Sequence, residues 1–419
     1  MKALLKNTAI ISIGSFFIAL GNYAFHPIMA RFLTVAEFGE FQALMALIYL
    51  IGIPAATIGL VTKKQTASYY GHDQLGKVRA LRNWLDKVFI LIGIAGILLI
   101  LSLSNPITSF LKLTSNTPLL ILGILFPLSL LQTIHASILE GLHRFPWSSL
   151  NGILATASKI LLGGTLGYLG WGVSGALIAA ISVGLIPFFL VLWETRDLPH
   201  HQTLDQAEKK KLLLYAIPTL LNVFCITMLY NWDLILVKHY LSPELAGQYG
   251  ALALFGKIIL FSSGPIVVAL FPMAAAHQNQ NRQLQLILQA LFLTLLVGVT
   301  ATTMFFILPN FLVSMLMGSS FSPIAPLLGL IGITFSFFSL NNILVQFFIS
   351  TEKTRGAFIL LLSITLMTAG ISLFHGSLEE IIKVLLGIQA FTFILLLVYL
   401  FADRFQTPHE SDFDPIPRL

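Results

Sequence analysis

Long apolar runs are the feature of this sequence that most limits its fold. A bilayer core of about 30 Å requires about 20 apolar residues in each crossing helix. Unpaired strand edges are not tolerated in lipid, and the runs are too long for the strands of a barrel. The sequence therefore predicts an all-α integral membrane protein with about twelve transmembrane helices, at residues 8–30, 41–62, 84–104, 117–139, 147–169, 172–193, 212–237, 246–275, 285–307, 322–349, 356–374 and 380–402.

The composition supports this prediction and excludes other classes of protein. Hydrophobic residues make up 56% of the 419-residue chain and charged residues 10%, whereas soluble domains carry roughly 25% charged residues. Because so few charged residues cannot cover so much apolar material, soluble single-domain enzymes and disordered scaffolds are excluded. The net charge of +6 does not indicate nucleic-acid binding, because the cations lie in short segments between apolar runs.

We find no catalytic, cofactor-binding or metal-binding motif, and we predict that the protein is not an enzyme. The adjacent residues His200 and His201 do not make a four-coordinate metal site. The single cysteine, Cys225, lies in an apolar run, where an inert buried side chain is expected. A membrane-bound sugar polymerase or ligase is disfavoured, because every predicted outer link is short.

The positions of lysine and arginine predict the orientation. Cytoplasmic loops of membrane proteins carry an excess of both residues. If the N-terminus is cytoplasmic, seventeen of the 24 lysines and arginines fall on the inside and three lie within spans, which leaves four outside, namely Arg31, Lys112, Lys238 and Lys383. We therefore predict that both termini are cytoplasmic.

An internal repeat divides the chain into two halves. An offset of 208 residues aligns 31–44 with 239–252. Because this offset covers six helices, an even number, the repeat is parallel and its pseudo-axis follows the membrane normal. We predict two pseudo-symmetric six-helix bundles at 1–193 and 212–402, a cytoplasmic linker at 194–211 and a disordered cytoplasmic tail at 403–419. The aligned identities are Leu33/Leu241, Gly39/Gly247, Ala43/Ala251 and Leu44/Leu252.

The paired segments also resemble a known family. Residues 30–44, 234–249 and 256–258, with a weaker match at 139–145, are similar to regions of bacterial polysaccharide-biosynthesis flippases. These flippases belong to the multidrug/oligosaccharidyl-lipid/polysaccharide (MOP) exporter superfamily, which includes the MATE transporters. The resemblance implies export of a lipid-linked oligosaccharide, carried on polyprenyl diphosphate, across the bacterial inner membrane. It also implies polysaccharide polymerases or glycosyltransferases as partners.

Two lysines within the spans are the main candidates for binding an anionic substrate. Ionisable groups inside a membrane are rare and usually face a cavity. Lys159 lies at the centre of the fifth predicted span, next to Asn151 on a polar stripe, and Lys257 lies well inside the eighth. Both lysines and Asn151 are predicted to bind a diphosphate or an acidic sugar. The alternative for each lysine is a structural pair with a carboxylate or with backbone carbonyls.

Asp233 and His26 are candidates for ion coupling. Asp233 is the only carboxylate well inside a span. It is predicted to bind H⁺ or Na⁺, to neutralise a lysine of the cavity, or to be a solvated charge at the outer mouth. His26 shares a polar stripe of the first span with Asn22, a further substrate-binding candidate. Histidine titrates near neutral pH, but a histidine that only forms hydrogen bonds is the alternative.

Three other polar residues are candidate substrate ligands. Asn342 and Gln346 share a face of the tenth span, where amides suit sugar hydroxyls but also join helices. Arg31 is an outer-side cation placed to contact phosphate at the end of the transport path. Single arginines at the membrane interface are, alternatively, markers of topology.

These features predict an alternating-access flippase with an electropositive cavity between its two bundles. The alternative is a cation-coupled multidrug antiporter of the MATE type. Cationic drugs favour an acidic cavity, and the first half of the chain has no acid deep in a span. The flippase is therefore the preferred prediction.

Overall fold

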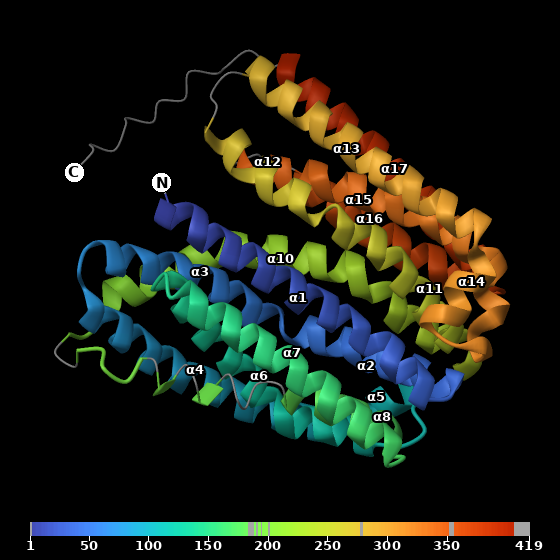
Figure 1. Ribbon diagram of the computed structural model, residues 1–419, viewed down its shortest axis with the longest axis horizontal. Helices are drawn as coiled ribbons and strands as arrows, with labels where there is room; N and C mark the ends of the chain where they lie inside the picture. Colours follow the sequence, from blue (N-terminus) through green and yellow to red (C-terminus); the bar gives the residue numbers. More distant parts are fainter. Residues whose placement is uncertain are drawn as a thin grey trace.

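The structure is a computed structural model. It describes residues 2–182, 188–189, 192–193, 195–199, 202–276, 280–351 and 356–405. Helices make up nearly all of these residues. Within these ranges there is no strand (Figure 1). The first half contains α1 (Lys2–Phe32), α2 (Val35–Ile51), α3 (Ile53–Gly71), α4 (Leu75–Ser102), α5 (Ser104–Phe110), α6 (Thr117–Gly141), α7 (Phe145–Tyr168) and α8 (Gly172–Ser182). The second half contains α10 (Gln206–Tyr240), α11 (Pro243–Ser262), α12 (Gly264–Ala276), α13 (Gln280–Ile307), α14 (Pro309–Leu316), the 3₁₀ helix η1 (Ser319–Leu327), α15 (Leu328–Ser350), α16 (Gly356–Leu373) and α17 (Leu378–Phe405).

This architecture confirms the predicted all-α membrane class. Among the described residues, eight helical segments are long and apolar enough to cross a membrane, and the pair α2–α3, bent by 48°, makes a ninth. The other predicted runs coincide with α1, with α7 and with α8, although the end of 172–193 lies partly outside the described residues. Each of the twelve predicted runs therefore has a helical counterpart.

Equivalent residues of the repeat begin the second helix of each half. The hydroxyl of Thr34 accepts a hydrogen bond from the backbone N–H of Glu37 at 3.3 Å. The hydroxyl of Ser242 accepts one from the N–H of Leu245, also at 3.3 Å. A helix leaves its first N–H groups without backbone partners, and a hydroxyl at the N-cap satisfies one of them. The repeat therefore preserves the start of α2 and of α11.

Corresponding helices of the two halves also pack in corresponding pairs. α1 packs on α7 as α10 packs on α16, and α4 packs on α6 as α13 packs on α15. The pairs α6–α8 and α7–α8 have their counterparts in α15–α17 and α16–α17. The molecule thus consists of two pseudo-symmetric bundles, here called the N-lobe (α1–α8) and the C-lobe (α10–α17).

The two lobes approach each other most closely where α2 crosses α11. A Cβ atom added to Gly39 would lie 2.5 Å from the backbone nitrogen of Gly247. A Cβ atom added to Gly247 would lie 1.8 Å from the carbonyl oxygen of Val35. This pair is one of the identities of the repeat, and only hydrogen fits at either position. The short helices α5 and α14 lie at the same end of the molecule (Figure 1), here called the α5/α14 end and predicted to face outward.

The contacts between the lobes are not symmetric along their length. α10 packs along α2 and α3 of the N-lobe, in addition to α16 of its own lobe. Its counterpart α1 has no comparable packing on α11 or α12 within the described ranges. The lobes are therefore joined along α10 and more separated on the side of α1.

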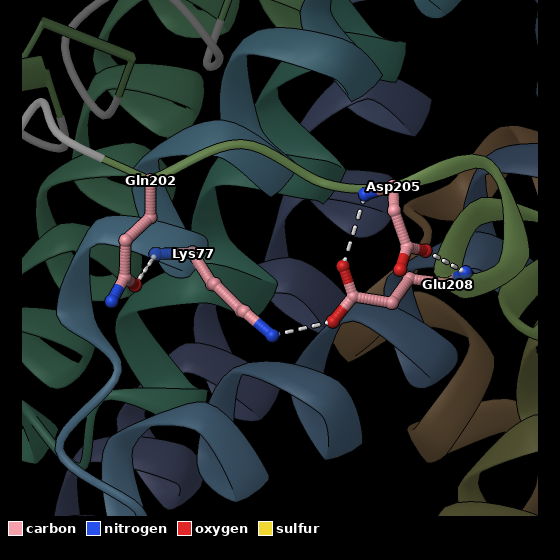
Figure 2. A network of polar contacts seen from close by, with 4 residues as sticks. All are labelled: Lys77, Gln202, Asp205 and Glu208. Atoms are coloured by element: carbon pink, nitrogen blue, oxygen red, sulfur yellow. Dashed lines mark hydrogen bonds and ion pairs between the residues drawn. The ribbon is translucent and has the colours of Figure 1, made fainter.

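The segment that leads into α10 is attached to the N-lobe by polar contacts (Figure 2). The backbone N–H of Lys77 donates to Oε1 of Gln202 at 3.0 Å, and its Nζ donates to Glu208 at 2.7 Å. Asp205 and Glu208 form a capping box at the start of α10. Because of this cap the helix begins at Gln206, within the predicted linker.

Other sequence-based boundaries fall where the structure gives no description. His200 and His201 lie outside the described residues, as does most of the predicted tail, since the description ends with α17 at Phe405. The domain boundaries proposed from the sequence stay predictions.

Candidate functional site

A cavity of about 350 Å³ lies between the two lobes. It is lined by α1, α2 and α7 of the N-lobe and by α10 and α11 of the C-lobe. The α2–α11 crossing bounds it toward the α5/α14 end, because its lining continues from Gln42 and Gly250, one turn beyond that crossing, to Tyr49 and Phe261. Among the residues predicted to act on the substrate or on a coupling ion, Asn22, His26, Lys159 and Lys257 line this cavity.

Lys159 provides the cationic group of the N-lobe. Its side chain is 6% exposed, and its Nζ donates a hydrogen bond to Oδ1 of Asn22 at 3.3 Å. The same Nζ lies 4.4 Å from the ring centroid of Phe25, a distance suited to a cation–π interaction. Among the described residues, no carboxylate forms an ion pair with Lys159, so one hydrogen bond and one aromatic face leave much of its charge available.

Lys257 provides the cationic group of the C-lobe in a similar setting. Its Nζ donates to Oδ1 of Asn231 at 3.3 Å, the same contact that Lys159 makes with Asn22. Asp233, on the same helix as Asn231, is close enough for a favourable electrostatic interaction with Lys257. The carboxylate of Asp233 accepts a hydrogen bond from Oη of Tyr249 at 2.6 Å.

Asp233 lies behind the wall of the cavity. It is 2% exposed and is not among the lining residues. One of its oxygens is bound by Tyr249, and the other is buried without a hydrogen-bond partner. This position is compatible with the sequence-based alternative in which the carboxylate neutralises a lysine of the cavity, and that role stays a prediction.

Neutral polar side chains complete the lining. Tyr23, Gln42, Tyr49 and Tyr230 contribute phenolic and amide groups near the two lysines. His26 lies among them, with its ring 5.7 Å from that of Phe41. Because the described lining contains two ammonium groups and no carboxylate, the cavity has an electropositive character suited to anions.

Four predicted site residues lie elsewhere in the structure. Asn151 is buried on α7 and does not line the central cavity. Asn342 lines a separate small cavity inside the C-lobe, and Gln346 lies on the same helix outside both cavities. Arg31 lies at the α5/α14 end, where its Nη2 donates to the backbone oxygen of Met315 at 2.6 Å.

Sequence reasoning missed the aromatic and amide part of the lining. Tyr23 adjoins Asn22, but its position one residue along α1 places it off the polar stripe that marked that helix. Gln42 lies at the edge of an apolar run, where a single amide does not indicate a binding residue. Asn231 was recognisable only by its nearness to Asp233, and its contact with Lys257 joins two different helices.

The two-lobed helical fold and the cavity between the lobes define a class of protein, namely the membrane transporters of the MOP type. The structure is similar to an inward-facing multidrug resistance MATE family transporter of the MOP superfamily, with a TM-score of 0.80 at 11% identity over 93% of this chain and 96% of that one. It is also similar to the lipid II flippase MurJ in an inward closed conformation, with a TM-score of 0.73 at 16% identity over 96% and 88% of the two chains. An outward-facing MATE family transporter gives a TM-score of 0.60 at 14% identity over 97% of each chain.

The chain belongs to the polysaccharide biosynthesis protein family, whose model matches residues 4–278. No curated protein matches the sequence significantly. Family membership and fold together identify a multi-pass membrane transporter or flippase of the MOP superfamily.

Proposed function

We propose that this protein is an alternating-access flippase that moves a polyprenyl-diphosphate-linked oligosaccharide from the cytoplasmic to the outer leaflet. The observation that carries the proposal is the pair of lysines, one from each lobe, that line one cavity. Lys159 and Lys257 are each held by a single asparagine, Asn22 and Asn231. Membership of the polysaccharide biosynthesis family supports the substrate class.

A diphosphate matches the charge of this cavity. An ammonium group and a phosphate oxygen 4 Å apart attract each other by about 4 kcal/mol at an effective dielectric constant of 20. Two lysines facing two phosphates therefore provide a favourable charge–charge interaction for a bound diphosphate. Because the lysines belong to opposite lobes, a bound diphosphate would draw the lobes together.

The size and borders of the cavity suit the head of such a lipid. Its volume of about 350 Å³ is at the lower end of the range for ligand pockets, which suits a diphosphate with its first sugar. Tyr23, Gln42 and Asn22 provide groups for sugar hydroxyls. The polyprenyl tail would stay in the lipid on the side where α1 is not packed on α11, beside the exposed Phe261.

Transport in proteoliposomes tests this proposal. The substrate is a fluorescent polyprenyl-diphosphate sugar, and the readout is its appearance in the opposite leaflet. We expect Lys159→Ala and Lys257→Ala each to reduce the rate about tenfold or more, because each removes one charge–charge contact. Lys87→Ala is the matched control: this lysine also lies within a predicted span, but it is exposed on α4 away from the cavity. Equal rates for wild type, both cavity variants and the control would refute the proposed role.

Coupling and localisation belong to the same proposal. Asp233 would modulate Lys257 from behind the cavity wall, and H⁺ or Na⁺ would be the coupling ion. His26 would act as a cavity ligand or proton carrier. We propose that the protein lies in the bacterial inner membrane with both termini cytoplasmic. Its partners would be the glycosyltransferases and the polysaccharide polymerase of the same biosynthetic pathway.

A cation-coupled multidrug antiporter is the second candidate, since MATE family transporters share the fold. It would need a carboxylate that meets a cationic drug, but Asp233 does not line the cavity and its carboxylate accepts a hydrogen bond from Tyr249. Efflux of a cationic dye by wild type, abolished in Asp233→Asn, would favour the antiporter. Efflux at the background level together with lipid transport would exclude it.

A further inference from the structure

The lobes are connected at the α5/α14 end by the same contact made twice, once in each direction. From the N-lobe, Nη2 of Arg31 donates to the backbone oxygen of Met315 at 2.6 Å. From the C-lobe, Nδ1 of His239 contacts the backbone oxygen of Phe110 at 2.8 Å. Arg31 and His239 are aligned by the 208-residue offset of the repeat. Each lies in the last turn of the first helix of its lobe, α1 or α10.

The two acceptors are equivalent as well. Phe110 is the last residue of α5, and Met315 is the second-last residue of α14. These two short helices occupy the same place in their lobes, after α4 and after α13. The last carbonyls of a helix have no intrahelical partner and carry partial negative charge, so they favour a cationic donor. Both contacts therefore cap the C-terminus of a short helix in the opposite lobe.

The contact from the C-lobe is reinforced by stacking and by a neighbouring lysine. The rings of His239 and Phe110 are parallel, with centroids 4.0 Å apart. A carbonyl oxygen can only accept, so Nδ1 of His239 must carry the hydrogen. Beside this contact, Nζ of Lys112 in the N-lobe lies 3.3 Å from the carbonyl oxygen of Leu241, just after the end of α10.

These contacts lie beyond the point where the lobes are packed most tightly. Phe38 of α2 meets Phe321 of η1 across the interface, with ring centroids 5.4 Å apart. The Gly39/Gly247 crossing lies next to Phe38. Opening the cavity toward the α5/α14 end must separate these surfaces, and it cannot do so without breaking the contacts of Arg31 and His239.

We propose that Arg31 and His239 form a two-part latch that holds the α5/α14 end closed and sets how often it opens. Arg31 then acts on the gate of the cavity, through the carbonyl of Met315, and not as a ligand of the substrate. The latch rests on the alternating access contained in the proposed function, but it does not depend on the identity of the transported lipid. Because both contacts break in one movement, their effects on the closed population multiply.

Distances between spin labels in the full-length protein in lipid nanodiscs, without substrate, test the latch. The labels are attached at Tyr168→Cys and Leu373→Cys, in a Cys225→Ser background. These two residues end α7 and α16, one in each lobe, and are 84% and 73% exposed. We expect one short distance for the parent, and a longer population that grows about fivefold in Arg31→Ala and in His239→Ala, as expected for one lost hydrogen bond. The double variant should show about a 25-fold increase.

Lys383→Ala is the matched control, because it removes an outer-side cation whose ion pair, among the described residues, is with Glu379 on its own helix. It should leave the distances unchanged. Unchanged distances in both single variants would overturn the latch, as would an equal shift in the control. If transport of the lipid falls in Arg31→Ala while the distances stay fixed, Arg31 binds substrate and the latch is wrong. If the distances shift as expected but no lipid is transported by the parent, the latch stands and the proposed function fails.

Discussion

Gly247→Ala is the substitution for which the structure predicts the largest effect on the closed end. The new Cβ would lie 1.8 Å from the carbonyl oxygen of Val35, whereas ordinary contacts begin at 3.4 Å. The obstacle is backbone, which cannot rotate away as a side chain can. α2 and α11 would therefore have to separate by about 1.6 Å, the difference between these two distances.

The cost of this separation follows from what is known of overpacked interiors. Inserting one methyl group into a closely packed site costs about 1–3 kcal/mol. We expect the cost of a clash with the backbone to lie at the upper end of this range. A loss of about 3 kcal/mol lowers the closed population about 100-fold relative to the open one. The label pair at residues 168 and 373 should then report mainly the long distance.

Gly387→Ala provides the control for this prediction. It lies in α17, where an added Cβ meets nothing within 4 Å, so the distances should not change and the unfolding temperature should not fall. A distance distribution of Gly247→Ala that matches the parent would refute the reasoning. So would a loss of folded protein without any opening, because the clash would then act on the whole fold and not on the gate.

Three further substitutions test the duplicated cap and the group behind the cavity. Thr34→Ala and Ser242→Ala should each destabilise the protein by about 1 kcal/mol, the usual cost of losing an N-cap hydroxyl. Thermal unfolding in detergent measures this loss of stability. A difference of several kcal/mol between the two variants would contradict the equivalence of the two caps. Tyr249→Phe should cost about 1–3 kcal/mol, since it leaves the buried carboxylate of Asp233 without its hydrogen bond; an unchanged unfolding temperature would show that Asp233 is satisfied by another group.

The order and class of the helices were predictable from the sequence because they depend on local properties. The length of an apolar run decides whether it can cross a bilayer, and hydrogen bonds inside each helix satisfy its backbone. The repeat was also visible, since Gly39 and Gly247 align at a fixed offset. Nothing in that alignment indicated that these two glycines touch each other.

The cavity was only partly predictable for a related reason. Lys159 and Lys257 stood out because charges within spans are rare and usually serve a function, and both line the cavity. Asn342 stood out equally as a polar group in a span, yet it faces the interior of its own lobe. A polar stripe shows that a helix has a preferred face, but it does not show which neighbour covers that face.

Arg31 shows most clearly what the tertiary structure decided. Its sequence position marks it only as a cation near the membrane surface, which suits a phosphate, a topology signal or a protein contact equally well. Its partner, Met315, lies 284 residues away and was unremarkable in the sequence. The sequence determined which segments form the apolar helices and where charge enters the membrane, because burial in lipid acts on each segment by itself. Which charges face the cavity and which close it depended on how the two lobes meet, because such contacts join residues that no local pattern relates.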